Sequence, residues 1–101
     1  MLYTAIRKYS IMPAFLEEVM QRIVGDFLPI IRELPDYVMY YAVRGETNEV
    51  ITISIFSTPV GAEESNPLAL EWVQNNIARF VQGEPEVTTG RVFAGSVGAR
   101  T

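Results

Sequence analysis

Residues 37–57 contain two strand-like runs, "YVMYYAV" (residues 37–43) and "VITISIFS" (residues 50–57), joined by "RGETNE". Both runs consist mainly of β-branched and aromatic residues, which are enriched in strands. The connection is short enough to join antiparallel neighbours, so this stretch predicts a β-hairpin.

The sequence before the hairpin predicts a strand followed by a helix. "LYTAIRKYSI" (Leu2 to Ile11) alternates apolar with small or charged residues, as a strand does. Residues 12–34 then repeat apolar positions at helical spacing. Pro29 would clash with the carbonyl of residue 25 in a regular helix, and residue 25 is a glycine. We therefore expect a kinked helix, or two short helices joined at Gly25-Asp26.

The sequence after the hairpin predicts a second helix and a last strand. In "AEESNPLALEWV" (residues 62–73), Asn66 suits an N-cap and Pro67 the first helical position, with Ser65 as the alternative cap. The helix is expected to run to about Val81, with a core stripe of Leu70, Val73, Ile77, Phe80 and Val81. "QGEPE" should break the chain before the strand "VTTGRVFAGSV" (residues 87–97).

The resulting order is β-α-β-β-α-β, which predicts an α+β, ferredoxin-like fold across residues 1–101 as a single domain. Such a fold has a four-stranded antiparallel sheet with two helices on one face. We expect the uncovered face to be too apolar for water, and a homodimer to form sheet against sheet. The residues expected there are Thr52, Ser54, Phe56, Tyr3, Tyr9, and either Met39 or Tyr41.

Composition excludes several kinds of site. The chain has no cysteine and no histidine, which removes thiolate chemistry, disulfides, and the commonest base and metal ligand. Its net charge is −4, and Lys8 is the only lysine among 8 basic residues, so a nucleic-acid partner is not expected. No run is long and apolar enough for a membrane span. We expect a cytoplasmic protein without a metal or an organic cofactor.

The element order, the segment "ELPDYVMYYAV" and the segment "SIFSTPVGAEESNPLALEWV" resemble the antibiotic biosynthesis monooxygenase-like group. The resemblance covers roughly Leu2 to Val97. It implies a dimeric α/β barrel with a small cavity between helices and sheet in each subunit. Characterised relatives oxidise phenolic or quinol-type aromatics with molecular oxygen, without metal or flavin. Other relatives bind and degrade haem, but this chain has no histidine to ligate the iron.

Four residues are candidates for the site that the resemblance implies. Trp72 would stack on an aromatic ligand, although packing at an edge or interface is the alternative. Arg7, on an expected central strand, would hold an anionic oxygen, or would pair with a carboxylate across the sheet or dimer. Asn66 would share the oxygen-binding role, or would only cap a helix. Tyr40 would relay protons; it points to the opposite face from Tyr41, and strand aromatics are usually packing.

Three functions follow from these alternatives. The first is a cofactor-independent monooxygenase acting on a small phenolic or quinol-type aromatic. The second is a homodimer that binds a small ligand without catalysis. The third is a structural protein whose cavity is filled by its own side chains. Fold alone does not choose among them.

Overall fold

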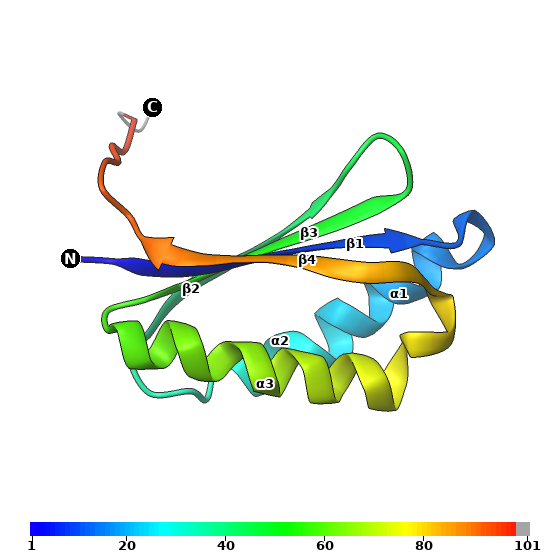
Figure 1. Ribbon diagram of the computed structural model, residues 1–101, viewed down its shortest axis with the longest axis horizontal. Coiled ribbons are helices and arrows are strands. Elements are labelled where there is room, and N and C mark those ends of the chain that lie inside the picture. Colours follow the sequence, from blue (N-terminus) through cyan, green and yellow to red (C-terminus); the bar gives the residue numbers. More distant parts are fainter. Residues whose placement is uncertain (99–101) are drawn as a thin grey trace.

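The computed structural model describes residues 1–98 as one antiparallel sheet with its helices packed on a single face (Figure 1). The elements are β1 (Tyr3–Ile11), η1 (Pro13–Phe15), α1 (Leu16–Arg22), η2 (Ile23–Phe27), α2 (Leu28–Ile31), β2 (Tyr37–Arg44), β3 (Glu49–Phe56), α3 (Pro59–Asn76), η3 (Ala78–Phe80) and β4 (Val81–Arg91). Their order confirms the ferredoxin-like arrangement. None of the helices within residues 1–98 has the length and apolar character to cross a membrane.

The sheet has the strand order β2-β3-β1-β4, so β1 and β3 occupy its centre. The predicted hairpin forms as β2 and β3, with Ala42 opposite Thr52. On β1, Arg7 lies between Thr52 of β3 and Val87 of β4. A charged side chain is therefore carried by a strand that has neighbours on both sides.

The two faces of β3 are the reverse of what the sequence predicted. Thr52, Ser54 and Phe56 are buried beneath the helices, whereas the isoleucines face the uncovered side. Tyr9 is buried on the helix side as well, and Met39 and Tyr41 are exposed on the open side. Alternation fixes which residues share a face but not which face is covered. Here a buried polar group on β1 requires hydroxyl partners on the covered face of β3.

The first helical segment changes its winding where the sequence predicted a kink. Residues 23–27 form a π-helical turn, in which the N–H of Leu28 donates to the carbonyl of Ile23. Pro29 follows this turn and cannot donate a backbone hydrogen bond. The wider turn joins α1 to α2, and it contains the Gly25-Asp26 step expected to link two short helices.

The second helix begins earlier than predicted. Thr58 is its N-cap: the Thr58 Oγ1 accepts a hydrogen bond from the Gly61 N–H at 3.1 Å, and Pro59 takes the first helical position. Asn66 and Pro67 therefore lie inside α3 and do not start it. Thr-Pro and Asn-Pro are equivalent start signals in sequence, and the earlier one is used. The helix ends at Asn76, short of the predicted Val81.

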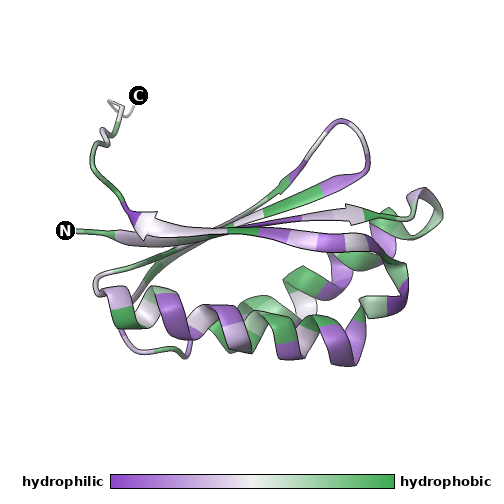
Figure 2. Ribbon diagram, viewed as in Figure 1, coloured by the Kyte–Doolittle hydropathy of each residue, from purple (hydrophilic) through white to green (hydrophobic). Residues whose placement is uncertain are grey.

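The buried face of α3 also differs from the predicted stripe. Trp72 is buried with 7% of its surface exposed, whereas Leu70 is 53% exposed. Figure 2 shows hydrophilic and hydrophobic residues alternating along α3, so hydropathy marks its inner face only weakly. Small residues at helical spacing let the helix approach the sheet closely; they are Ala62, Ser65 and Ala69.

The segment predicted to break the chain is part of β4. Residues 82–86 lie within this strand, where the pairing with β1 shifts between Lys8 and Ser10. Gly83 adopts a positive φ of 73°, a backbone conformation that favours glycine. The irregularity is therefore a β-bulge inside one strand, not a boundary between elements. Residues 92–98 follow β4 without regular secondary structure.

Candidate functional site

Arg7 is a buried cation held by neutral oxygen atoms. Only 2% of its surface is exposed. Its Nη1 donates to Ser65 Oγ at 3.2 Å and to Asn66 Oδ1 at 2.9 Å, both on α3. Its Nη2 donates to Ser54 Oγ on β3 at 2.8 Å. The guanidinium thereby links the sheet to the helix that covers it.

No carboxylate within residues 1–98 lies in salt-bridge range of Arg7, so the predicted carboxylate partner is not found across the sheet. Burial lowers the pKa of Arg7, and the neighbouring phenols of Tyr9 and Tyr40 oppose this shift. Arginine nevertheless stays protonated in proteins. The site therefore holds an uncompensated positive charge, which favours an anion beside it.

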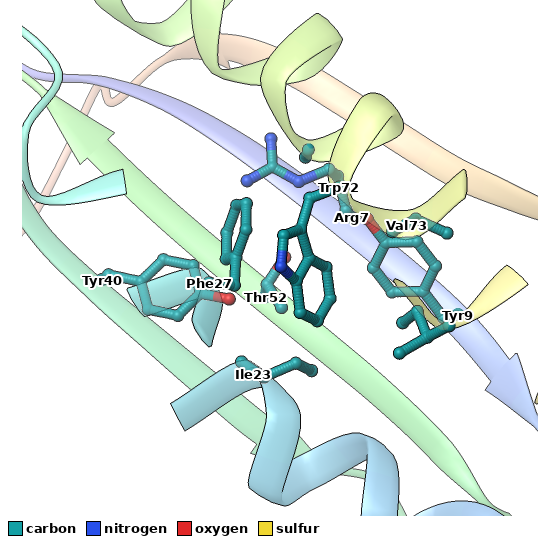
Figure 3. A pocket seen from close by; sticks show the side chains of 10 residues that line it. Arg7, Tyr9, Ile23, Phe27, Tyr40, Thr52, Trp72 and Val73 are labelled. Carbon is teal, nitrogen blue, oxygen red and sulfur yellow. The ribbon is translucent and has the colours of Figure 1, made fainter. Parts of the chain in front are cut away.

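Three buried polar atoms at this position have no hydrogen-bond partner within residues 1–98: Arg7 Nε, Tyr40 Oη and Thr52 Oγ1. Buried polar groups are nearly always paired. Here the Tyr40 phenol faces the Thr52 hydroxyl and Arg7 faces the Tyr9 phenol, so the polar atoms of this region are directed toward one another. All three residues line a small cavity of about 10 Å³, shown in Figure 3. That volume holds roughly one water-sized molecule. Burial raises the pKa of Tyr40, although the charge of Arg7 opposes the rise, so its phenol stays protonated.

Aromatic side chains form the wall of this cavity. Trp72 packs against Phe27 with ring centroids 5.3 Å apart and planes at 52°, and Phe27 packs against Tyr40 at 5.8 Å. In Figure 3 the indole lies between Arg7 and Ile23, with Phe27 on one side and Tyr9 on the opposite side. Trp72 therefore lines an interior cavity; it does not lie on the outer surface of α3.

An open groove of about 410 Å³ lies on the other side of Arg7, between α3 and β4. Its volume is within the range of small-molecule sites. Most of the lining is apolar, and the charged members are Arg7 and Glu84. Burial raises the pKa of Tyr9, which lines both spaces, while the charge of Arg7 opposes this rise. The full lining is Arg7, Tyr9, Asn66, Pro67, Leu70, Val73, Glu84, Pro85 and Val87.

Asn66 connects the groove to the buried charge. Its Oδ1 accepts from Arg7, and its Nδ2 donates to Thr89 Oγ1 on β4 at 2.9 Å. One amide thus orients the guanidinium and ties α3 to the edge strand. Asn66 therefore holds Arg7 from the middle of α3 and does not cap the helix as predicted.

Comparison with solved structures identifies the fold. NE2512, a protein of unknown function from Nitrosomonas europaea, is 13% identical, with 98% of this chain and 96% of that chain covered and a TM-score of 0.76. A monooxygenase from Streptomyces coelicolor in complex with nanaomycin D is 13% identical, with 96% and 92% covered and a TM-score of 0.75. SnoaB, a cofactor-independent oxygenase from Streptomyces nogalater, is 14% identical, with 93% and 95% covered and a TM-score of 0.67.

This chain has the fold of the antibiotic biosynthesis monooxygenase-like proteins. At these identities the likeness concerns the fold. No protein-family model and no curated protein matches the sequence. The sequence-based expectation of an antibiotic biosynthesis monooxygenase-like fold is confirmed.

On this antibiotic biosynthesis monooxygenase-like fold, the four candidate residues come together. Arg7, Tyr40 and Trp72 line the small cavity, and Asn66 binds Arg7 from the groove side. Within residues 1–98 there is no cluster of three or more acidic side chains that could hold a metal ion. Sequence reasoning missed several neighbours of Arg7. The spacing of Arg7 and Tyr9 on one strand face was the available signal. The missed residues are Tyr9, Thr52, Ser54, Ser65 and Glu84.

Proposed function

We propose that this protein is a cofactor-independent monooxygenase that oxidises a small phenolic or quinol-type aromatic with molecular oxygen. The observation that carries the proposal is the buried, uncompensated guanidinium of Arg7 between an aromatic-walled cavity and an apolar groove. The names of proteins that share the fold, a monooxygenase and a cofactor-independent oxygenase, agree with this activity.

The groove is the place for the aromatic ring. The small cavity, at about 10 Å³, cannot hold a ring, whereas the groove offers about 410 Å³ between Leu70, Val73 and Val87. A ligand there would direct its oxygen toward Arg7. An opposite charge at close range favours the ionised form of a phenol and so lowers its pKa. The ionised ring is richer in electrons and reacts more readily with oxygen.

The small cavity lined by Tyr40, Thr52 and Trp72 is the place for dioxygen, which is larger than water and needs these side chains to move slightly apart. Tyr40 and Thr52 present their hydroxyl groups to this space. Both can donate hydrogen bonds to the negative charge that develops as oxygen is reduced, and the dry aromatic wall strengthens such interactions. Trp72 completes the wall of this cavity and does not line the groove, so it does not stack on a ring bound there.

The overall reaction balances without a cofactor. A ring carbon bearing two hydrogens loses one as a proton, and the carbanion passes an electron to dioxygen. Recombination forms a carbon–oxygen bond and gives a peroxide. Loss of the second hydrogen and cleavage of the O–O bond leave a carbonyl and water, so one oxygen atom enters the substrate. Arg7 stabilises the delocalised anion throughout this sequence.

The same protein is proposed to act as a homodimer through the open face of its sheet. This face carries Ile53 and Ile55 with Tyr41, which is 57% exposed in the single chain. Residues 92–98 leave β4 on the side away from the helices, and Phe93 is 90% exposed (Figure 1). An apolar surface of this kind is normally covered by a partner, and a two-fold dimer buries it with one type of contact.

Oxygen uptake with a panel of phenols, quinols and anthrones tests the activity. Trp72 is the only tryptophan, so its fluorescence reports binding in the same samples. Saturable quenching with oxygen uptake is expected in the wild type, and Arg7→Met should abolish uptake. Arg32→Met, an exposed arginine away from both spaces, is the matched control. Quenching without uptake for every compound would make the protein a ligand-binding protein and contradict the proposal.

A further inference from the structure

The β-bulge in β4 changes which side chains this strand presents to the groove. Lys8 pairs with Glu86, and Ser10 pairs with Gln82, so Gly83, Glu84 and Pro85 together lie opposite Tyr9 alone. A bulge re-aims side chains and ends regular pairing locally. Gly83 with its positive φ permits the turn of the backbone.

The consequence is a carboxylate at the rim of the groove. Glu84 and Pro85 both line the groove, whereas the Glu86 carboxylate lies 3.9 Å from the Lys8 Nζ. Glu84 is the only acidic residue among those lining the groove or the small cavity. Within residues 1–98 it has no ion-pair partner. Its carboxylate is therefore available to a ligand that lies in the groove.

Arg7 and Glu84 give the groove two poles of opposite charge on an apolar surface. A planar ligand that spans them would place an anionic oxygen at the buried guanidinium and a proton donor at the carboxylate. The proposed reaction needs a base of this kind, and the chain has no histidine to supply one.

We propose that Glu84 is the catalytic base that removes the ring proton in the proposed reaction. This inference rests on the proposed function. The Glu84 carboxylate takes one methylene proton, and the carbanion delocalises its charge onto the oxygen held by Arg7. After dioxygen adds, the protonated Glu84 returns its proton as the O–O bond breaks. The peroxide anion and this proton become a carbonyl and one water, and the carboxylate is restored.

Hydrogen–deuterium exchange without oxygen isolates the first step. Anthrone is incubated in deuterated buffer with the protein under nitrogen, and loss of the methylene signal is followed by NMR. The wild type should exchange this signal faster than buffer alone. Glu84→Gln should reduce the protein-catalysed rate by about 10²-fold or more, the usual contribution of a positioned base. Glu86→Gln, whose carboxylate is exposed and directed toward Lys8, should exchange at the wild-type rate.

The outcomes separate the two proposals. Exchange that requires Glu84, together with no oxygen uptake in air, would support the base and contradict the oxygenase. Oxygen uptake that Glu84→Gln leaves unchanged would contradict the base and keep the oxygenase. Wild-type protein that does not accelerate exchange overturns the role of Glu84, as does equal loss in both variants. Quenching of Trp72 by anthrone in Glu84→Gln verifies that the variant still folds and binds.

Discussion

At the scale of single residues, Arg7 determines the character of the interior. Hydroxyl and amide oxygens from Ser54, Ser65 and Asn66 replace the water that its guanidinium loses on burial. Neutral partners accept hydrogen bonds from its two terminal nitrogens without neutralising its charge. An ion pair would have done both, so this arrangement keeps the charge available to a ligand.

Replacing Arg7 tests whether it is retained for binding or for stability. Arg7→Met keeps much of the volume and removes the cost of burying an unpaired charge. We expect the free energy of unfolding in urea to fall by about 1–3 kcal/mol, because the oxygens of Ser54, Ser65 and Asn66 lose their donor. Binding of ionised phenols should fall about tenfold or more. A loss of stability of roughly 3–5 kcal/mol would instead make Arg7 a structural residue.

The exposed pair of Lys8 and Glu49 gives a prediction for pH. Their Nζ and Oε2 atoms lie 3.0 Å apart. The hydrogen bond from Lys8 lowers the pKa of Glu49 below its ordinary 4.5 and raises that of Lys8 above 10.5. A lowered carboxylate pKa stabilises the fold above 4.5, and this contribution is lost as pH falls through the folded value. Glu49→Gln should therefore lower the Tm at neutral pH and not in strong acid.

Salt provides the control for this pair. Exposed ion pairs are screened at high ionic strength, so the Tm difference at neutral pH should shrink in 1 M salt, where the screening length is about 3 Å. A difference that persists in strong acid or in high salt would show that Glu49 stabilises the fold by packing and not by charge.

The candidate residues were predictable by type, and their contacts were not. A single arginine on a central strand indicated a buried charge, and Trp72 was marked by being unique. The partners of Arg7 come from β3 and α3, at sequence separations of 47 to 59 residues. Glu84 could not be predicted as a site residue, because "QGEPE" has the composition of a break between elements. The position of Glu84 at the groove depends on the pairing of β4 with β1.

At the scale of elements, two glycines on the helical layer should respond in opposite directions to the same change. A Cβ at Gly25 would meet nothing within 4 Å, whereas a Cβ at Gly61 would lie 2.9 Å from Phe56 Cδ1. Gly25→Ala should raise the free energy of unfolding by about 0.5–1 kcal/mol, because alanine loses less entropy in a helix. Gly61→Ala should lower it by about 1–3 kcal/mol through overpacking.

Urea unfolding of both variants beside the wild type measures the difference. The result for Gly25 is the more informative of the two, because this glycine lies in the π-helical turn. If Gly25→Ala destabilises the protein, this turn needs glycine for a reason other than space, and the packing account of the helical layer fails there.

Element types were more predictable than element boundaries. The hairpin, the winding change before Pro29 and the helix on either side of Trp72 follow from local propensity and periodicity. The start of α3 could not be predicted in this way, because Thr58-Pro59 and Asn66-Pro67 carry the same capping signal. The prediction of its buried face was also wrong, because Ala62, Ser65 and Ala69 are buried for their small size and not for their hydropathy.

At the scale of the whole molecule, one face of the sheet is covered by helices and the other is open (Figure 1). Ile53 lies at the middle of the open face, paired with Ile6 on β1 and Tyr41 on β2. We predict that the wild type sediments as a dimer and that Ile53→Lys sediments as a monomer, because a charge there cannot be buried without a partner.

Val60→Lys is the matched control for this prediction, since Val60 is exposed on α3 and far from the open face. It should remain a dimer. A monomeric wild type at micromolar concentration, or a dimeric Ile53→Lys, would contradict the assignment of the open face as the dimer interface.

The central claim is that the buried charge of Arg7 acts on an aromatic oxygen bound in the groove. The most direct test is the ionisation of a bound nitrophenol, followed by its absorbance between pH 5 and 9. Bound to the wild type, the phenol should ionise roughly 1–3 pH units below its free value, as expected for an opposite charge in contact. When the phenol is bound to Arg7→Met, this lowering of its ionisation pH should be absent. Equal ionisation of the phenol in both proteins would contradict the account.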